Sequence, residues 1–309
     1  FLSLRCTHTR ACMMREVSRA KWLPLVLLAV GGLVLRQLLL FTRLDNPSEE
    51  LAAASVGRAI LHHGDFTEYE AFVQGVLTAL RARPSGTPSL EWTLHNLGAS
   101  LVDGLWVEFG VYLATSTNKL ARNLTALGSE RHVIAFDSFQ GLPEEWRRNP
   151  AMSQKWHSRW VGKGAFDIGG EAPFWAEKNI DFVVGWFNES VPQWVSEELP
   201  KLNLGISLLH IDSDIYSSAA TVLENLEGHL YPGCVVVFDE LINYAEFRDH
   251  EMKALWEFYQ RLPSTRSLEV LGYPGPQLLG GTPEEIQAAI TKQGKEHGAY
   301  QQNAVVRVW

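Results

Sequence analysis

From Gly104 onward, short apolar runs alternate with amphipathic segments. Five runs have the length and the glycine or carboxylate boundaries of buried strands. They are Leu105–Gly110, His132–Phe136, Ile180–Gly185, Gly205–Ile211 and Cys234–Asp239. Apolar residues recur at helical spacing in Ser116–Leu127 and in Tyr216–Leu230, which lie between runs. This alternation predicts right-handed crossovers and a parallel sheet with helices on both faces.

Two further apolar runs close the chain, Leu268–Gly272 and Ala304–Trp309, and bring the expected sheet to seven strands. The fold class is therefore α/β, a Rossmann-like doubly wound sheet that is mostly parallel. Such sheets bind ligands outside the carboxyl ends of their strands. The residues at which each strand stops are the candidates for chemistry.

The main domain is expected to span residues 104–309, after a helical preface at residues 42–103 that is broken at Pro84–Pro88. Within the domain, residues 144–179 are rich in aromatic residues and glycines. Aromatic faces on a glycine-hinged loop can close over a sugar or an aromatic ring, so we interpret this stretch as a lid insertion. An irregular hydrophobic patch on the sheet is the alternative.

The N-terminal part differs in kind. A basic tail, residues 1–21, precedes a hydrophobic segment at residues 22–41, which is long enough to cross a bilayer at roughly 30 Å as a helix. The asymmetry of charge predicts a single-pass membrane anchor with a cytoplasmic N-terminus and a lumenal or extracytoplasmic catalytic domain. A cleaved signal peptide, an organelle-targeting leader and a soluble protein are the alternatives.

Composition excludes several classes of function. The formal net charge is −8, and no run of lysine and arginine follows the N-terminal tail, which argues against a nucleic-acid partner. Of the three cysteines only Cys234 lies in the main domain, so neither a disulfide framework nor a cysteine zinc site can form there.

The first strand ends in an acid followed two residues later by glycine, Glu108 and Gly110. Tyr112 and Thr115 stand where a dinucleotide fingerprint needs glycines, so NAD binding is not expected. Ser116 or Thr115 can cap the next helix. The spacing of acid and glycine resembles the first motif of class I methyltransferases.

Asp137 ends the second strand. An acid at this place can accept hydrogen bonds from both hydroxyls of a ribose, although a turn aspartate is the alternative.

Carboxylates also follow the fourth and fifth strands, Asp212 and Asp214 after one, Asp239 and Glu240 after the other. Like charges this close repel one another unless a cation lies between them. Oxygen ligands suit Mg²⁺ or, less specifically, Mn²⁺ or Ca²⁺, so we predict a metal site at Asp212, Asp239 and Glu240. Helix capping is the alternative role for these acids.

Together these motifs resemble the macrocin O-methyltransferase family of class I methyltransferases, which act on sugar hydroxyls. The matching segments are Glu108-Phe-Gly-Val111, Asp137-Ser-Phe-Gln-Gly-Leu-Pro143, Gly164-Ala-Phe-Asp-Ile-Gly-Gly170, Gly185-Trp-Phe187, His210-Ile-Asp-Ser-Asp-Ile-Tyr216 and Phe238-Asp-Glu240. The resemblance implies S-adenosylmethionine and Mg²⁺ as cofactors and a small-molecule or glycan acceptor. Candidate cofactor-binding residues are Glu108, Gly110, Tyr112, Ser116, Asp137, Ser138, Gly185 and Asp212. Ala114 stands where the family often has glycine, and its methyl group is expected near the methionine part of the cofactor.

In the mechanism that this implies, Mg²⁺ lowers the pKa of an acceptor hydroxyl and a base removes its proton. Asp212 is the first candidate for the base, and His250 is the second, with helix capping as the alternative role of His250. A homodimer is left open. The rival functions are a membrane-anchored glycosyltransferase that uses the triplet Asp212-Ser-Asp214 and a non-catalytic cofactor-binding protein.

Overall fold

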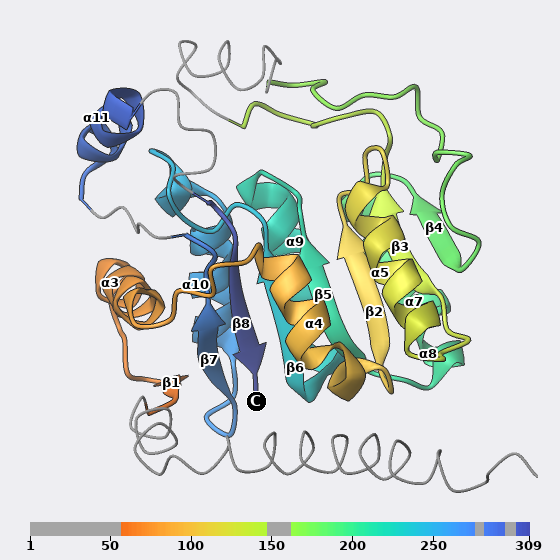
Figure 1. Cartoon of the computed structure of the whole chain (residues 1–309), viewed down its shortest axis with the longest axis horizontal. Coiled ribbons are helices and arrows are strands. Elements are labelled where there is room, and N and C mark those ends of the chain that lie inside the picture. The colour runs from red at the N-terminus through yellow and green to blue at the C-terminus, as the bar shows by residue number, and fades with distance from the viewer. Residues whose placement is uncertain (1–56, 147–161, 276–280, 294–300) are drawn as a thin grey trace, which may run out of the picture. The chain divides into compact units, whose positions relative to one another are not determined.

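The computed structural model describes residues 57–146, 162–275, 281–293 and 301–309 (Figure 1). Residues Arg58–Trp309 form one compact unit. Its centre is an eight-stranded sheet with the order β1-β7-β8-β6-β5-β2-β3-β4. The strands are β1 (Ala59–His62), β2 (Leu105–Phe109), β3 (Val133–Asp137), β4 (Ile180–Val184), β5 (Ile206–Ile211), β6 (Leu230–Phe238), β7 (Ser267–Gly272) and β8 (Ala304–Val308).

Five strands, β6, β5, β2, β3 and β4, run parallel, whereas β8 is antiparallel to both β6 and β7. The predicted class, an α/β sheet that is mostly parallel, is confirmed. The predicted count of seven strands is wrong, because β1 adds an antiparallel edge strand with Leu61 opposite Leu268. Ile60 and Leu61 were expected in a helix. A four-residue strand with a single buried side chain is too short to show its own period.

Helices cover both faces of the sheet (Figure 1). Those on one face are α3 (Tyr69–Arg81), α7 (Phe187–Glu197), α9 (Tyr216–Leu226) and α10 (Glu251–Arg261), and those on the other are α4 (Ser89–Leu101) and α5 (Thr115–Ala126). Short or peripheral helices are α8 (Leu199–Leu202), α11 (Pro283–Gln293) and the 3₁₀ turns Glu227–His229 and Phe247–Asp249. The helix expected at residues 216–230 ends at Leu226, because Leu230 already begins β6.

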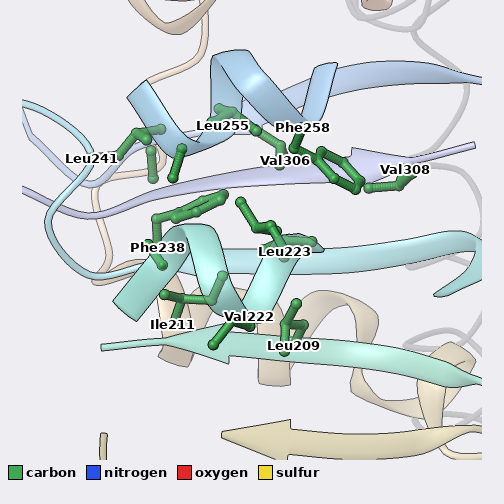
Figure 2. Close-up of a cluster of buried hydrophobic side chains, with 14 of the residues drawn as sticks. Leu209, Ile211, Val222, Leu223, Phe238, Leu241, Leu255, Phe258, Val306 and Val308 are labelled. Carbon is green, nitrogen blue, oxygen red and sulfur yellow. The ribbon is translucent and has the colours of Figure 1, made fainter. Parts of the chain in front are cut away.

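The larger hydrophobic core lies between the sheet and the face that α9 and α10 cover. Figure 2 shows side chains of β5, β6 and β8 meeting those of the two helices, with Leu223 and Phe258 among them. Residues of β5 point alternately to the two faces, so Leu209 and Ile211 enter this core while Leu208 enters the smaller one under α4 and α5. The packing on both faces fixes the strand ends that carry the candidate site.

The predicted membrane localisation is not supported. No helix in the described part of the chain is long and apolar enough to cross a membrane. The longest described helices, α3 and α4, have 13 residues, about 20 Å, and bury one side against the sheet. The segment at residues 22–41 and the tail before it lie outside the described residues.

Phe258→Ala tests this core. Its ring is fully buried (0% exposed), so we expect the substitution to lower the free energy of unfolding by about 3–5 kcal/mol. The matched control is Phe174→Ala, because the Phe174 ring is 94% exposed and its loss should change stability by less than about 0.5 kcal/mol. Urea unfolding of both variants measures the difference, and equal losses would contradict this account of the core.

Candidate active site

The site lies where the connections of the sheet change direction. The chain leaves β2 for β3 on one side, and it leaves β5 for β6 on the other, although β2 and β5 are direct neighbours. Loops after two such strands diverge and leave a crevice at their carboxyl ends. A cleft of about 1310 Å³ opens there and is lined by residues that follow β2, β3, β4, β5 and β6.

Gly110 permits the ends of β2 and β5 to approach each other. Its φ is +95°, and a Cβ atom on it would lie 1.7 Å from the carbonyl oxygen of Asp212. The N–H of Asp212 in turn donates to the carbonyl oxygen of Phe109 at 2.8 Å. Residue 110 therefore has no room for a side chain. The neighbour that excludes one is the protein backbone.

Asp137 braces the loop that follows β2. Its Oδ2 atom accepts hydrogen bonds from the N–H groups of Val111 and Tyr112, both at 2.8 Å, and Oδ1 accepts one from Phe139 at 2.7 Å. Burial raises the pKa of the Asp137 carboxyl, and these hydrogen bonds act against the rise. These bonds occupy both lone pairs of Oδ2 and one of Oδ1, so the turn role leaves one lone pair of Oδ1 for a ribose hydroxyl in the cleft that Asp137 lines.

Glu108 lies beneath the cleft and does not line it. The side chain is fully buried (0% exposed) and accepts hydrogen bonds from His210 Nδ1 at 2.8 Å and from Thr117 Oγ1. Burial alone lowers the pKa of His210, but the hydrogen bond and the charge of Glu108 outweigh it and raise that pKa. Glu108 therefore joins β2 to β5 and α5, although it was predicted to line the cofactor cleft.

The structure brings Asp212, Asp239 and Glu240 together. Oxygen atoms of the three carboxylates lie within 4.8 Å of one another, at the ends of β5 and β6. Burial raises the pKa of both Asp212 and Glu240 well above its usual range, and the negative charge of Asp239 adds to this. The Oε2 atom of Glu240, a residue only 7% exposed, has no hydrogen-bond partner within the described residues.

This donor set fits a hard divalent cation. Three carboxylates at one point repel each other, and a cation among them offsets both the repulsion and the loss of hydration. Oxygen ligands alone, with an open cleft on one side for water or substrate, are the pattern that Mg²⁺ favours.

One wall of the cleft comes from the lid insertion, for which the sequence predicted the segment but not the individual residues. The ring of Tyr112 packs edge-on against Phe166 of the lid insertion, with centroids 5.5 Å apart, and Ser217 Oγ donates to Glu144 at 2.6 Å. Residues 147–161 of the insertion lie outside the described residues. Reasoning from sequence placed Trp186 and Phe187 in a motif without giving them a role, and it missed Asn188 and the hydroxyl groups at the start of α9; all of these line the cleft. Their position directly after strands was the available signal.

The remaining predicted residues divide into two groups. Tyr112, Ser138 and Gly185 line the cleft, whereas Ser116 does not. The expected capping by Ser116 or Thr115 is absent, because α5 begins after a left-handed Ala114 and has no side-chain cap.

Ala114 itself is buried in the smaller hydrophobic core and does not line the cleft. His250 lies at the N-cap of α10 and lines a second cavity of about 280 Å³, which adjoins the cleft because Glu144 and Trp146 line both.

Comparison with known proteins identifies the family. A family model described as macrocin-O-methyltransferase (TylF) matches residues 88–261, more than half of the chain. The chain belongs to the macrocin-O-methyltransferase family. The predicted family is thereby confirmed, and so, at the level of the family, is the prediction of an O-methyltransferase.

Individual relatives of this macrocin-O-methyltransferase family member are distant. The chain is 26% identical over 159 residues to 8-demethyl-8-(2,3-dimethoxy-alpha-L-rhamnosyl)-tetracenomycin-C 4'-O-methyltransferase of Streptomyces olivaceus, covering 49% of this chain and 58% of that relative. Among solved structures, a calicheamicin methyltransferase is 21% identical, with 81% of this chain and 95% of that chain covered and a TM-score of 0.43. The O-methyltransferase TomG of Streptomyces achromogenes is 15% identical, with 84% of this chain and 96% of TomG covered and a TM-score of 0.38.

Gly110→Ala tests the approach of β2 to β5. The new methyl group would overlap the carbonyl oxygen of Asp212 in a left-handed conformation, so we expect a loss of about 2–4 kcal/mol in the free energy of unfolding. The matched control is Gly228→Ala, where a Cβ atom meets nothing within 4 Å. Chemical denaturation of the two variants gives the comparison. A Gly110→Ala protein as stable as the control would show that the strand ends can separate freely.

Glu240→Gln tests the repulsion among the carboxylates. A pKa raised above that of the unfolded chain means that the charged form destabilises the folded state, and this effect grows as the pH rises. With EDTA present at pH 8, we therefore expect the variant to be more stable than the wild type by on the order of 1 kcal/mol, with a smaller gain at pH 5. Urea unfolding at both pH values measures this, with Glu224→Gln on the exposed side of α9 as the control. Equal stability at pH 8 would contradict the repulsion.

Proposed function

We propose that the protein is an S-adenosylmethionine-dependent and Mg²⁺-dependent O-methyltransferase that acts on a hydroxyl group of a sugar or polyol-like small molecule or glycoconjugate. The proposal depends on one observation: most of the candidate cofactor-binding residues and the candidate metal ligands line the same cleft. The loop after β2, with Asp137 and Gly185, forms one wall, and the carboxylates of Asp212, Asp239 and Glu240 lie beside it.

The cofactor would lie along the first of these walls. Asp137 and Ser138 offer oxygen atoms at the end of β3, where a ribose would bind, and Gly185 leaves the end of β4 without a side chain, where an adenine would fit. Tyr112 and the lid residue Phe166 offer aromatic faces at the mouth. Ala114 lies outside the cleft lining, which removes the reason to expect that it obstructs the cofactor.

The acceptor would lie beside the carboxylates. Asp212, Asp239 and Glu240 would hold Mg²⁺, which when bound polarises an acceptor hydroxyl and lowers its pKa. The carboxylate of Asp212 is our candidate to accept the hydroxyl proton, because Asp212 lines the cleft itself whereas His250 lines only the adjoining cavity. The walls of the cleft then align the acceptor oxygen with the methyl group while the lid limits access of water.

The acceptor class rests on the family and on the function of one relative. The Streptomyces olivaceus enzyme is a 4'-O-methyltransferase of a rhamnosyl-bearing compound, which supports a sugar-linked acceptor here. The glycosyltransferase alternative is less well supported. Both aspartates of Asp212-Ser-Asp214 line the cleft, but the carboxylates grouped with Asp212 come from the next strand, β6. A homodimer stays a prediction.

Calorimetry with the full chain tests the proposal. S-adenosylmethionine should bind in the micromolar range, and a nucleotide sugar should not compete with it. Asp239→Ala should keep this binding, because Asp239 lies on the metal side of the cleft, but should lose Mg²⁺-dependent transfer of a labelled methyl group to a sugar acceptor. Binding of the nucleotide sugar in place of S-adenosylmethionine would favour the glycosyltransferase, and full activity of Asp239→Ala would exclude the metal role.

A further inference from the structure

Glu251 is a buried carboxylate at the start of α10 that no motif had singled out. It follows His250 in the segment Arg248-Asp-His-Glu251, and its side chain is 0% exposed. No lysine or arginine in the described part of the chain forms an ion pair with it. An uncompensated buried charge destabilises a fold strongly, so its position calls for a physical reason.

The hydrogen bond of Glu251 reaches the loop after β6. Its Oε2 atom accepts the N–H of Glu240 at 3.0 Å. Glu240 follows Asp239 directly after β6. One buried carboxylate of α10 thus holds the loop on which two of the three predicted ligands lie.

These contacts differ from ordinary helix capping. An acid in the first turn of a helix usually accepts N–H groups of its own helix. The N–H group bound by Glu251 belongs to Glu240, 11 residues earlier in the chain and beyond the end of β6. A second observation points to a ligand at the same place. The Oε2 atom of Glu240 and the Oε1 atom of Glu251 are both buried without a hydrogen-bond partner among the described residues.

We propose that Glu251 is a positioning residue for the cation of the active site. It fixes the backbone of the loop after β6, so that the carboxylates of Asp239 and Glu240 face that of Asp212. This inference rests on the metal dependence stated under the proposed function, and it adds a residue from a helix to a site otherwise built from strand ends.

Two substitutions separate positioning from a charge effect. Glu251→Met has nearly the volume of glutamate but cannot accept a hydrogen bond, whereas Glu251→Gln keeps an amide oxygen for the N–H of Glu240. Losing a partner behind the ligands of a metal commonly lowers metal affinity 10- to 100-fold. We therefore expect Glu251→Met to bind Mn²⁺ at least about 10-fold more weakly than the wild type, and Glu251→Gln to stay within about 3-fold.

The readouts are Mn²⁺ affinity by electron paramagnetic resonance and S-adenosylmethionine affinity by calorimetry, both on the full chain. The cofactor affinity should stay unchanged in both variants, which a general loss of structure would not allow. Glu257→Gln is the matched control, since it removes the same charge from α10 at a residue that binds Tyr216 instead. It should bind Mn²⁺ as the wild type does.

Wild-type Mn²⁺ affinity in Glu251→Met would overturn the inference alone, and so would a Glu251→Gln protein as weak as Glu251→Met, because the charge would then act directly. A wild-type protein that binds no Mn²⁺ would overturn the metal part of the proposed function as well. Should Glu251→Met not fold, Glu251→Asp takes its place. It keeps the charge but withdraws the oxygens by one methylene, and unchanged Mn²⁺ affinity in it would likewise overturn the inference.

Discussion

The carbonyl oxygen of Asp212 occupies the place where a side chain of residue 110 would have to be. Because Gly110 leaves that place empty, β2 and β5 remain in contact to their last residues, and the loops after them diverge from one point. The cleft, the loop that Asp137 braces and the direction of the Asp212 side chain all depend on this contact. A glycine at the end of β2 is required first by the protein's own backbone, and any cofactor that binds nearby uses a geometry that already exists.

Much of this could be predicted from sequence because it depends on local patterns. Apolar runs located all the strands of the parallel core within one or two residues, apart from the early start of β6, and the residues after them include most of the cleft lining. The edge strand β1 was missed because four residues show no period, and its pairing with β7 joins segments about 200 positions apart. The direction of individual side chains at the strand ends could not be predicted either. Glu108 ends a strand as a ligand-binding acid would, yet it points below the cleft.

His250 and Glu251 show the same limit for two adjacent residues, because the sequence does not indicate which side chain enters the site. They are neighbours at the start of α10, and a histidine is a more usual base, so sequence reasoning named His250 as the second candidate after Asp212 and gave no role to Glu251. In the structure Glu251 is the one that reaches the loop after β6, whereas His250 lines the adjoining cavity. Which of two adjacent residues enters a site depends on where the preceding loop ends, and residues 240–250 carry no periodic pattern that fixes it.

The buried acids of this protein differ in their partners: one has a histidine beside it, and the others have only further carboxylates. This difference bears on function. Glu108 has a histidine partner, because it shares a hydrogen bond with His210 and its charge raises the pKa of that histidine. Glu240 and Glu251 are buried as well and lie beside further carboxylates, but no cationic side chain in the described part of the chain pairs with them. The acids at the floor of the cleft therefore depend on protonation or on a cation to offset their mutual repulsion. The metal role that we propose for Asp212, Asp239 and Glu240 supplies that cation from solution.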